Sequence, residues 1–474
     1  MSILDKYENL LNNIETVKLG GKVKRVIGVT VEGTGPQANI GELCKIIITD
    51  RTNRNEEKVL NAEVVGFRED GIVLMPYGSI SGISQGCQII GTGKTLEIPV
   101  SNSLLGRIVN GKCEPIDNKG SLIPDDHYSI FRGSPEALKR KRIKKKLSVG
   151  IKAIDGLLTI GEGQRVGIFS GSGIGKSTLL GMISRFTEAD VNVIALIGER
   201  GREVNDFLEN DLGKEGLKKS VVVVATSDEA PILRLRGAFV ATTIAEYFRD
   251  QGLKVMLLMD SITRFARAQR EIGLSVGEPP STRGFPPSVF SMLPVLLERS
   301  GASDKGSITA FYTILVEADD MNEPIADNVR GILDGHIVLS RDLASLNHYP
   351  PIDILESISR LMVHVTDQDH VDIALKIKEI LATYREAYDL INIGAYAKGS
   401  NPRIDHAIKM IDKVNEFLKQ GIYEKYTFQE TLDLLKAIFE SEQEEKTIKR
   451  SRLNTLNLTG VTGEKISIPP AKIT

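Results

Sequence analysis

The sequence contains few of the residues that build disulfide frameworks or zinc sites. Its 474 residues include only three cysteines and six histidines. The cysteines are odd in number, none of them has metal-ligand spacing, and the histidines form no zinc pattern. These shortages exclude a disulfide-bonded or zinc-binding scaffold and favour a reduced compartment. The cysteines are Cys44, Cys87 and Cys113.

Long apolar runs and a strong charge imbalance are also missing. No stretch of about 18 apolar residues occurs, so we expect no membrane span. The first residues carry acids and lack a continuous apolar core, which argues against a signal peptide. The formal net charge of −2 gives no overall bias toward nucleic acid or membranes. With 41% hydrophobic and 26% charged residues, the chain fits a cytosolic globular protein of two or three domains.

A glycine loop stands between an apolar run and a helical pattern. The run ends at Phe169, and the helical pattern begins near Leu179. Strand, glycine loop, Gly-Lys-Ser and helix is the arrangement of a phosphate-binding P-loop. The glycines turn backbone N–H groups toward an anion, and the helix N-terminus adds partial positive charge. The strict pattern has glycine where this chain has Ser170, so the assignment needs support from elsewhere.

The loop supplies the candidate nucleotide contacts. Lys176 can reach the β- and γ-phosphates, and Ser177 can hold a magnesium ion. The predicted phosphate-binding residues are Gly171, Ser172, Gly173, Ile174, Gly175, Lys176, Ser177 and Thr178.

Two carboxylates stand at the ends of predicted strands. Asp260 closes the apolar run that begins at Val255, and it could orient the waters of a magnesium ion. Glu199 follows the run that ends at Ile197 and could activate the attacking water, with Glu203 as the alternative. A salt-bridged loop is the structural alternative for Glu199, because arginines are adjacent to it.

Three arginines could neutralise the charge that develops on the γ-phosphate. Arg200 and Arg264 lie just after the two carboxylate-bearing strands. Arg360 is far downstream, and from the residues alone a helix-capping role and a catalytic role are equally open.

The whole chain predicts an α/β protein with further domains on either side. Short β-rich runs separated by Gly, Pro, Asn and Asp clusters over 22–93 predict a small barrel or sandwich. Residues 149–345 alternate β-rich and helical runs, which predicts a parallel sheet with ligands at the carboxyl ends of its strands. Residues 367–440 predict helices, with a capping box at Thr427 and Glu430. The expected divisions are a helix over 1–18, a β-barrel over 19–95, an ATPase domain over 96–365, a helical domain over 366–441 and a flexible tail over 442–474.

Two other stretches have open interpretations. Residues 3–17 predict an amphipathic helix, which could pack on its own barrel or dock on a partner protein or a lipid surface. Residues 139–146 carry seven positive charges, which form either a solvated connector or a patch for nucleic acid or lipid. The lack of aromatic residues beside this basic run favours the connector.

Several longer motifs are more specific than the P-loop. The stretches Gly-Ser-Gly-Ile-Gly-Lys-Ser-Thr-Leu-Leu-Gly-Met, Gly-Glu-Arg-Gly-Arg-Glu-Val and Met-Asp-Ser-Ile-Thr-Arg-Phe resemble the ATPases of type III protein export systems. So do Gly-Glu-Pro-Pro-Ser-Thr-Arg-Gly-Phe and Leu-Asp-Gly-His-Ile-Val-Leu-Ser-Arg-Asp-Leu-Ala. The match looks closest to the flagellum-specific branch and runs from Lys22 to about Phe439. This family is related to the subunits of rotary ATP synthases.

The resemblance implies an N-terminal β-barrel, a central RecA-like ATPase domain and a C-terminal helical domain. It also implies a homohexameric ring with ATP and Mg²⁺ at the subunit interfaces. In that arrangement Asp260 is the Walker B carboxylate, Glu199 is the general base, and Arg200 and Arg264 contact the γ-phosphate. Arg360 resembles a finger supplied by the neighbouring subunit. Tyr349 matches the aromatic residue that packs on adenine in this family.

The implied function is ATP hydrolysis that energises flagellar protein export, releasing cargo from chaperones and unfolding it at a membrane export gate. The implied partners are a dimeric regulator that binds the N-terminal helix, a coiled-coil stalk protein, and export chaperones with their cargo. The implied location is the cytoplasm, at the inner face of the cell membrane. An injectisome-type secretion ATPase is the nearest alternative, because the two branches share almost every catalytic motif.

Other functions fit less well. A catalytic subunit of a rotary ATP synthase usually has a different strand-end motif, from which Gly201 and Val204 depart. A RecA-type RNA translocase needs stacking aromatics in its barrel, and 22–93 offers only Phe67 and Tyr77, so we expect no nucleic-acid partner. A non-hydrolysing nucleotide-binding subunit is disfavoured because both candidate carboxylates are present.

Overall fold

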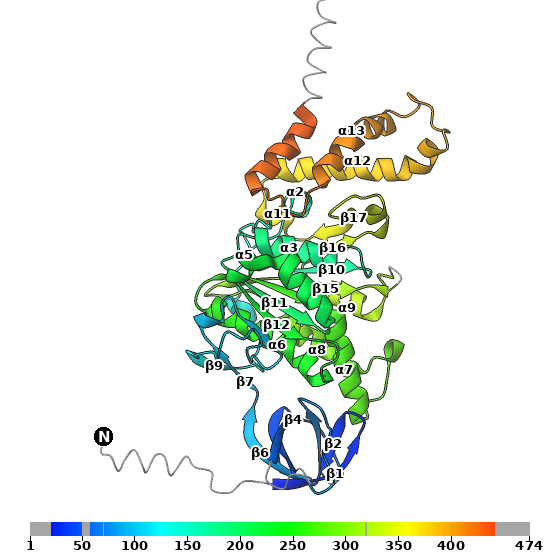
Figure 1. Cartoon of the computed structure of the whole chain (residues 1–474). Helices are drawn as coiled ribbons and strands as arrows, with labels where there is room; N and C mark the ends of the chain where they lie inside the picture. The colour runs from blue at the N-terminus through cyan, green and yellow to red at the C-terminus, as the bar shows by residue number, and fades with distance from the viewer. Residues whose placement is uncertain (1–19, 50–56, 70, 318–319, 441–474) are drawn as a thin grey trace, which may run out of the picture.

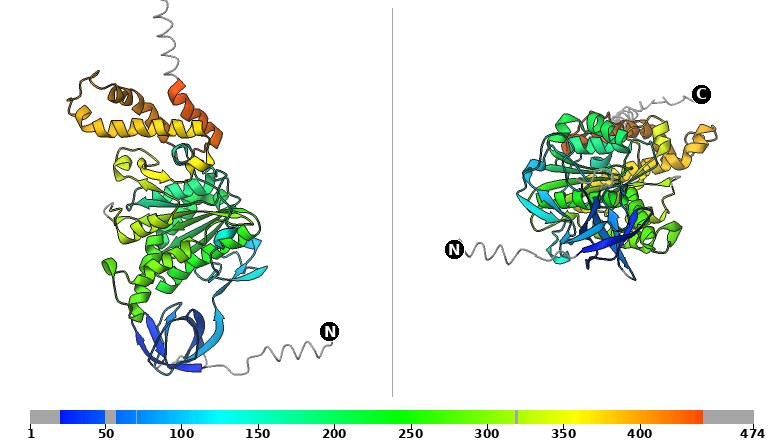
Figure 2. Two further views of the ribbon diagram at one scale, coloured as in Figure 1. Left: turned by 180° about the vertical axis from the view of Figure 1, so that it is seen from behind. Right: turned by 60° about the horizontal axis from the view of Figure 1, so that its bottom comes forward.

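Three bodies follow one another along the molecule. A β-barrel and a helical domain lie at opposite ends of a central α/β domain (Figure 1), and the view from behind in Figure 2 shows the same order. This computed structural model describes residues 20–49, 57–69, 71–317 and 320–440. The predicted N-terminal helix and the predicted tail lie outside the described residues.

The barrel is closed by six antiparallel strands in the order β1-β2-β5-β4-β3-β6. Cys44, Ile46 and Ile48 alternate along one strand and are all buried, as the two-residue period of a strand requires. A turn at 28–29 separates the first two strands. The strands are β1 (Gly20–Ile27), β2 (Thr30–Gly33), β3 (Glu42–Thr49), β4 (Glu57–Arg68), β5 (Gly71–Pro76) and β6 (Gln88–Thr95).

The central domain is built on a sheet in the order β17-β16-β10-β15-β13-β11-β12-β8. The parallel sheet predicted for 149–345 is present, and its strands from β16 across to β12 are all parallel to one another. An additional strand, β17, lies beyond the stretch for which a parallel sheet was predicted and runs antiparallel to β16 at one edge. The strands are β8 (Ile108–Asn110), β10 (Arg165–Ser170), β11 (Val191–Ile197), β12 (Ser220–Ala225), β13 (Lys254–Asp260), β15 (Ser307–Leu315), β16 (Gly335–Leu339) and β17 (Ile352–Ser359).

Helices cover both faces of this sheet, so its central strands, from β10 to β12 in the sheet order, are buried almost throughout. Along β11, Val193 and Ala195 pack in one apolar cluster with α6, α7 and α8, whereas Ile194 and Leu196 pack in the other with α3. This burial on both faces explains why the strands appear in the sequence as continuous apolar runs. The helices are α3 (Lys176–Phe186), α6 (Pro231–Asp250), α7 (Ile262–Val276), α8 (Pro287–Leu297) and α9 (Pro324–Ile332).

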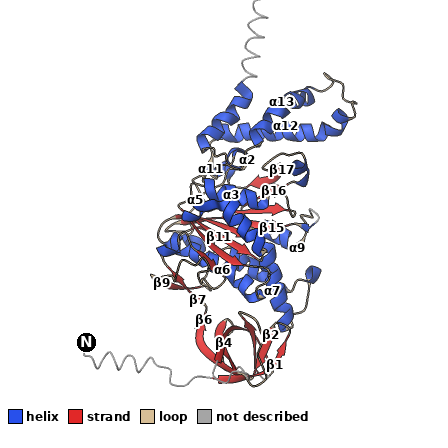
Figure 3. Cartoon of the chain, in the orientation of Figure 1, coloured by secondary structure: helices blue, strands red, loops and turns tan. Residues whose placement is uncertain are grey.

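In the part that the structure describes, the C-terminal domain consists of helices joined by loops, as Figure 3 shows. They are α12 (Gln368–Asn392), α13 (Pro402–Leu418) and a last helix over 428–440. The predicted capping box is present, because the Thr427 backbone N–H donates to Glu430 at 2.7 Å and the Glu430 N–H donates to Thr427 Oγ1 at 3.2 Å. Among the described residues, no helix combines the length and apolar character needed to cross a membrane.

The basic run lies along the central domain as an extended connector between β9 (Asp126–Ser129) and the short helix α2 (Lys152–Leu157). Arg140 donates to the carbonyl of Ser300 at 3.0 Å, and Lys141 donates to the carbonyl of Asp304 at 2.6 Å. Lys146 lies 3.5 Å from the centre of the Phe428 ring. Three of the seven cations therefore hold the run against other parts of the chain.

A buried ion pair joins the barrel to the central domain. Arg236 on α6 donates to both carboxylate oxygens of Glu63 on β4, through Nε at 3.0 Å and through Nη2. The hydroxyl of Tyr77 donates to the same carboxylate at 2.6 Å. Burial and the adjacent Glu63 raise the pKa of Tyr77 well above its usual value, so it remains a donor.

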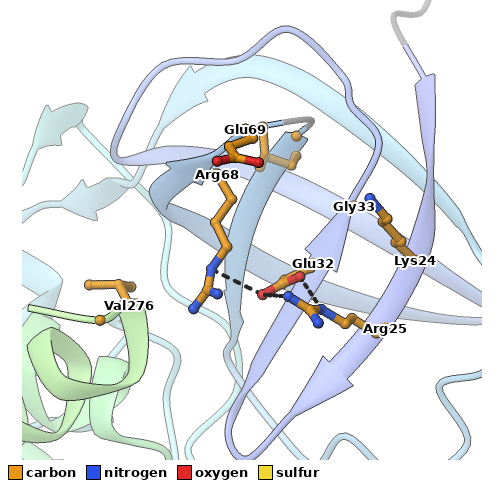
Figure 4. A pocket seen from close by; sticks show the side chains of 10 residues that line it. Lys24, Arg25, Glu32, Gly33, Arg68, Glu69 and Val276 are labelled. Carbon is orange, nitrogen blue, oxygen red and sulfur yellow. Dashed lines mark hydrogen bonds and ion pairs between the residues drawn. The ribbon is translucent and has the colours of Figure 1, made fainter.

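A second contact region lies at the same junction and is more open. Figure 4 shows a pocket of about 470 Å³ between the barrel and Val276 at the end of α7. Glu32 forms ion pairs there with Arg25 and with Arg68, the latter at 3.1 Å. Both arginines are about half exposed, so water screens these pairs much more than it screens the buried pair.

Glu63→Gln should lower the free energy of unfolding by about 3 kcal/mol, because it leaves Arg236 buried without a counter-charge. Glu32→Gln is the matched control and should lower it by about 1 kcal/mol or less, since its partners are exposed. Urea denaturation followed by circular dichroism measures both. Equal effects in the two variants would contradict the assignment of the buried pair as the main clamp.

Candidate functional site

The P-loop connects the end of β10 to the start of α3. Gly173 and Gly175 have φ values of 76° and 96°, which glycine adopts without strain. A Cβ on Gly173 would meet no atom within 4 Å, so the loop is open on that side. No side chain caps the first turn of α3, and no acid lies in it. The loop therefore presents unpaired N–H donors and a positive helix end, which is the donor set that a phosphate group needs.

Four charged side chains meet beside this loop. The Lys176 ammonium lies 2.5 Å from Asp260 Oδ1 and 3.5 Å from Glu199 Oε1. Arg264 Nη2 lies 3.2 Å from the other oxygen of Glu199. Lys176, Asp260 and Glu199 come from the carboxyl ends of three parallel strands, so the topology brings together what the sequence separates by as many as 84 positions.

Local structure explains how the arginine reaches Glu199. Ser261 caps α7 by accepting a hydrogen bond from the Arg264 backbone N–H at 3.4 Å. The side chain of Arg264 then lies across Gly198, where a Cβ would come within 2.7 Å of the arginine Cδ. Gly198 also has a φ of 71°, so the turn that leads into Glu199 needs glycine for two reasons.

The environment of Glu199 changes its proton affinity. Burial, a hydrogen bond with Glu203 and the nearby Asp260 raise the pKa of Glu199 to about 7, against the opposing effect of Lys176 and Arg264. The pKa of Lys176 is raised: burial opposes this, but the charges of Asp260 and Glu199 prevail. A carboxyl group whose pKa lies near neutrality can accept a proton under physiological conditions.

Other predicted residues do not belong to this cluster of four charged side chains. The Arg200 side chain is 77% exposed and lies 3.5 Å from Glu203, so it is outside the four-residue cluster. Ser177 is exposed at the start of α3, and Thr178 hydrogen-bonds the carboxyl group of Asp211. The Tyr349 ring lies beside the loop, 3.8 Å from where a Cβ on Gly175 would be, and is 43% exposed.

Arg360 lies at the amino-terminal end of the parallel strands, whereas the P-loop lies at their carboxyl-terminal end. Because β17 is antiparallel to β16, its last residue, Ser359, pairs with Gly335 at the start of β16. The P-loop begins level with Leu339 at the other end of that strand, roughly 13 Å away along the sheet. Arg360 is exposed and donates only weakly, at 3.4 Å, to the carbonyl of Arg330. Its side chain does not reach the loop of its own chain.

Sequence analysis missed one member of the site. Thr313 is fully buried on β15, between the strands that carry Lys176 and Asp260, and its hydroxyl donates to Asp260 Oδ1 at 2.7 Å. Its strand also contains Ser307 and Thr309, so the sequence does not single out Thr313. Without the strand order, nothing in the sequence relates that residue to Asp260.

The side chains beside the P-loop suit a metal ion that is bound together with phosphate groups. Among them, no three His, Cys, Asp or Glu side chains gather closely enough to hold a metal ion on their own. Ser177 and Asp260 provide two positions beside the loop, so phosphate oxygens and water would have to complete the coordination.

Comparison with known families assigns all three bodies of the chain. Residues 150–359 match the nucleotide-binding domain of the ATP synthase alpha/beta family, and residues 23–93 match its beta-barrel domain. Residues 366–437 match the C-terminal domain of the type III secretion ATPase EscN.

Individual relatives support the same family assignment. The flagellum-specific ATP synthase of Bacillus subtilis is 52% identical, over 92% of this chain and 100% of its own length. The type 3 secretion system ATPase of Xanthomonas euvesicatoria is 49% identical, over 88% of this chain and 93% of its own. The assembled EscN from enteropathogenic E. coli superposes with a TM-score of 0.83 at 46% identity, covering 88% of this chain and 99% of EscN. The chain therefore belongs to the nucleotide-binding type III protein export ATPases, a branch of the ATP synthase α/β family.

Proposed function

We propose that this protein hydrolyses ATP to energise flagellar protein export. The observation that carries the proposal is the contact of Lys176 with two carboxylates at strand ends, directly beside an open phosphate loop. Relatives named as flagellum-specific ATP synthases and type 3 secretion ATPases support it. Because both kinds of relative are about half identical to this chain, an injectisome-type role is the second candidate.

Each side chain of the cluster has a proposed part. Lys176 leaves its carboxylates and binds the β- and γ-phosphates, while Asp260 and Ser177 hold a magnesium ion. A bound magnesium ion neutralises charge on the phosphate oxygens. Glu199, freed from Lys176, accepts a proton from the attacking water, and Arg264 stabilises the γ-phosphate. Arg200 would have to leave Glu203 before it could contact a phosphate.

A ring completes the site. Arg360 lies on the edge of the sheet opposite its own P-loop, so it can act only on a nucleotide bound by another copy of the chain. A head-to-tail ring supplies this arrangement at every interface. Relatives solved as an assembled ATPase, and as a complex with a central stalk protein, support a homohexamer around a coiled-coil stalk. Tyr349 would pack on the adenine.

The remaining proposals follow from the family. The domains divide at residues 95 and 365, with the N-terminal helix over 1–18 binding a dimeric regulator. Chaperones with their cargo, and a membrane export gate, are the further partners. The enzyme acts in the cytoplasm, at the inner face of the cell membrane.

Glu199→Gln should bind ATP and lose about 100-fold or more of its turnover, because an amide cannot accept the proton from water. Phosphate release and nucleotide binding are measured on the same preparation. Glu203→Gln is the matched control and should keep most of the activity. Normal turnover in Glu199→Gln together with loss in Glu203→Gln would move the role of base to Glu203.

The raised pKa of Glu199 also affects stability. Between its usual pKa of 4.5 and about 7, the folded state holds a proton that the unfolded state has lost. The nucleotide-free protein should therefore become less stable, relative to Glu199→Gln, as the pH rises from about 5 to about 8. Urea denaturation at several pH values measures this. A constant difference between the two proteins would show that Glu199 titrates normally.

Mixed rings test the role of Arg360. Lys176→Ala and Arg360→Ala should each be inactive, and a random mixture of the two should recover activity at about one-quarter of the interfaces, where both halves are intact. A mixture of Lys176→Ala with Asp260→Ala is the control and should stay inactive, because both changes damage the same half. If the first mixture also stays inactive, Arg360 does not act between subunits.

A further inference from the structure

One buried glutamine connects the C-terminal helical domain to the central domain. Gln420 follows α13 and is 4% exposed. Its Oε1 accepts a hydrogen bond from the Lys152 backbone N–H at 2.8 Å, and its Nε2 donates to the Gly150 carbonyl at 2.9 Å. The same Nε2 donates to the carbonyl of Glu424 at 2.8 Å. The amide thus holds two points of the central domain and one point of its own domain.

The backbone of Gln420 makes a further bond. Its N–H donates to the carbonyl of Tyr349 at 2.9 Å. Tyr349 is the residue whose ring lies beside Gly175 of the P-loop. A displacement of the C-terminal domain at Gln420 would therefore act directly on the backbone that carries this ring.

The amide also reaches the other end of the P-loop helix. Gly150, to which Gln420 donates, is packed so closely on α3 that a Cβ there would lie 2.6 Å from Phe186 Cβ. The helix α3 begins at Lys176 and ends at Phe186. Gln420 thus contacts Tyr349 directly, and through Gly150 it is linked to the end of α3 that lies farthest from the phosphate loop.

Only an amide suits this position without rearrangement. The Lys152 N–H requires an acceptor, whereas the carbonyls of Gly150 and Glu424 require donors. A carboxylate would satisfy the first and be repelled by the other two, and an apolar side chain would leave all three groups unpaired. The position is therefore sensitive to changes that leave the volume of the side chain almost unaltered.

We propose that Gln420 is a positioning residue that couples the C-terminal helical domain to adenine binding, by fixing Tyr349 against the P-loop through its bonds to Tyr349, Gly150 and Lys152. A partner that moves the helical domain would thereby change the affinity for the adenine part of the nucleotide and leave phosphate binding unchanged. The inference rests on the proposed contact between Tyr349 and adenine.

A single tryptophan makes the contact measurable. The chain contains no tryptophan, so Tyr349→Trp in the full-length protein gives one fluorophore at the proposed adenine contact. ADP should quench its emission in a saturable manner. If ADP does not change the emission, Tyr349 does not contact the base, and both this part of the proposed function and the inference fail.

In the same background, Gln420→Glu should weaken ADP binding about tenfold, which is the effect of losing roughly one buried hydrogen bond. The KM for ATP should rise by a similar factor, with kcat within about twofold. Inorganic tripolyphosphate, which has no base, should inhibit hydrolysis equally in both proteins. Gln429→Glu is the matched control, because Gln429 is an exposed glutamine of the same domain, and it should bind ADP normally.

The outcomes separate positioning from simple destabilisation. Gln420→Met removes the three side-chain hydrogen bonds without adding charge. It replaces the glutamate variant if that variant does not fold. Weaker ADP binding with unchanged tripolyphosphate inhibition supports the inference. Unchanged ADP affinity in both Gln420 variants, with normal quenching in the parent, overturns the inference and leaves the proposed function standing. An equal loss for ADP and tripolyphosphate also overturns it, because Gln420 would then be needed only for the fold.

Discussion

The contact of the Lys176 ammonium with Asp260 and Glu199 is the interaction on which the site depends. Two buried carboxylates converge on one cation, and Arg264 balances the charge of Glu199. Such a cluster is stable only while its charges compensate one another, because a buried charge without a partner is strongly unfavourable. Phosphate groups that attract the lysine would release both carboxylates at once, which links binding to the chemistry that follows it.

The direction of the strands determines what one chain can do. All the parallel strands present their carboxyl ends at the same edge, and this edge carries the loop, both carboxylates and Arg264. Because the edge strand β17 is antiparallel to the others, Arg360 lies instead at the amino-terminal end of the parallel strands. The two halves of the proposed site are therefore separated within the chain, and the proposed ring of copies would bring them together.

Two buried polar contacts hold the two outer domains to the central domain. The Glu63–Arg236 pair fixes the barrel to α6, and Gln420 fixes the helical domain to the segment that precedes the P-loop helix. Both are polar contacts in dry surroundings, so they are strong only in one geometry. The barrel is held by charge, while the helical domain is held by Gln420, whose backbone N–H donates to the Tyr349 carbonyl. A movement of the helical domain therefore reaches the nucleotide site more directly.

The sequence by itself determined the strands, the P-loop and the candidate residues, because strands buried on both faces leave continuous apolar runs, and Asp260 ends one of them. It did not predict β17, whose mixed burial gives no such run, or Thr313, which is one of three small polar residues in β15. Only the tertiary structure decided which charges meet: it placed Arg264 on Glu199, left Arg200 exposed and put Gln420 behind Tyr349. Those contacts depend on strand order and domain packing, and neither is encoded in any local pattern of residues.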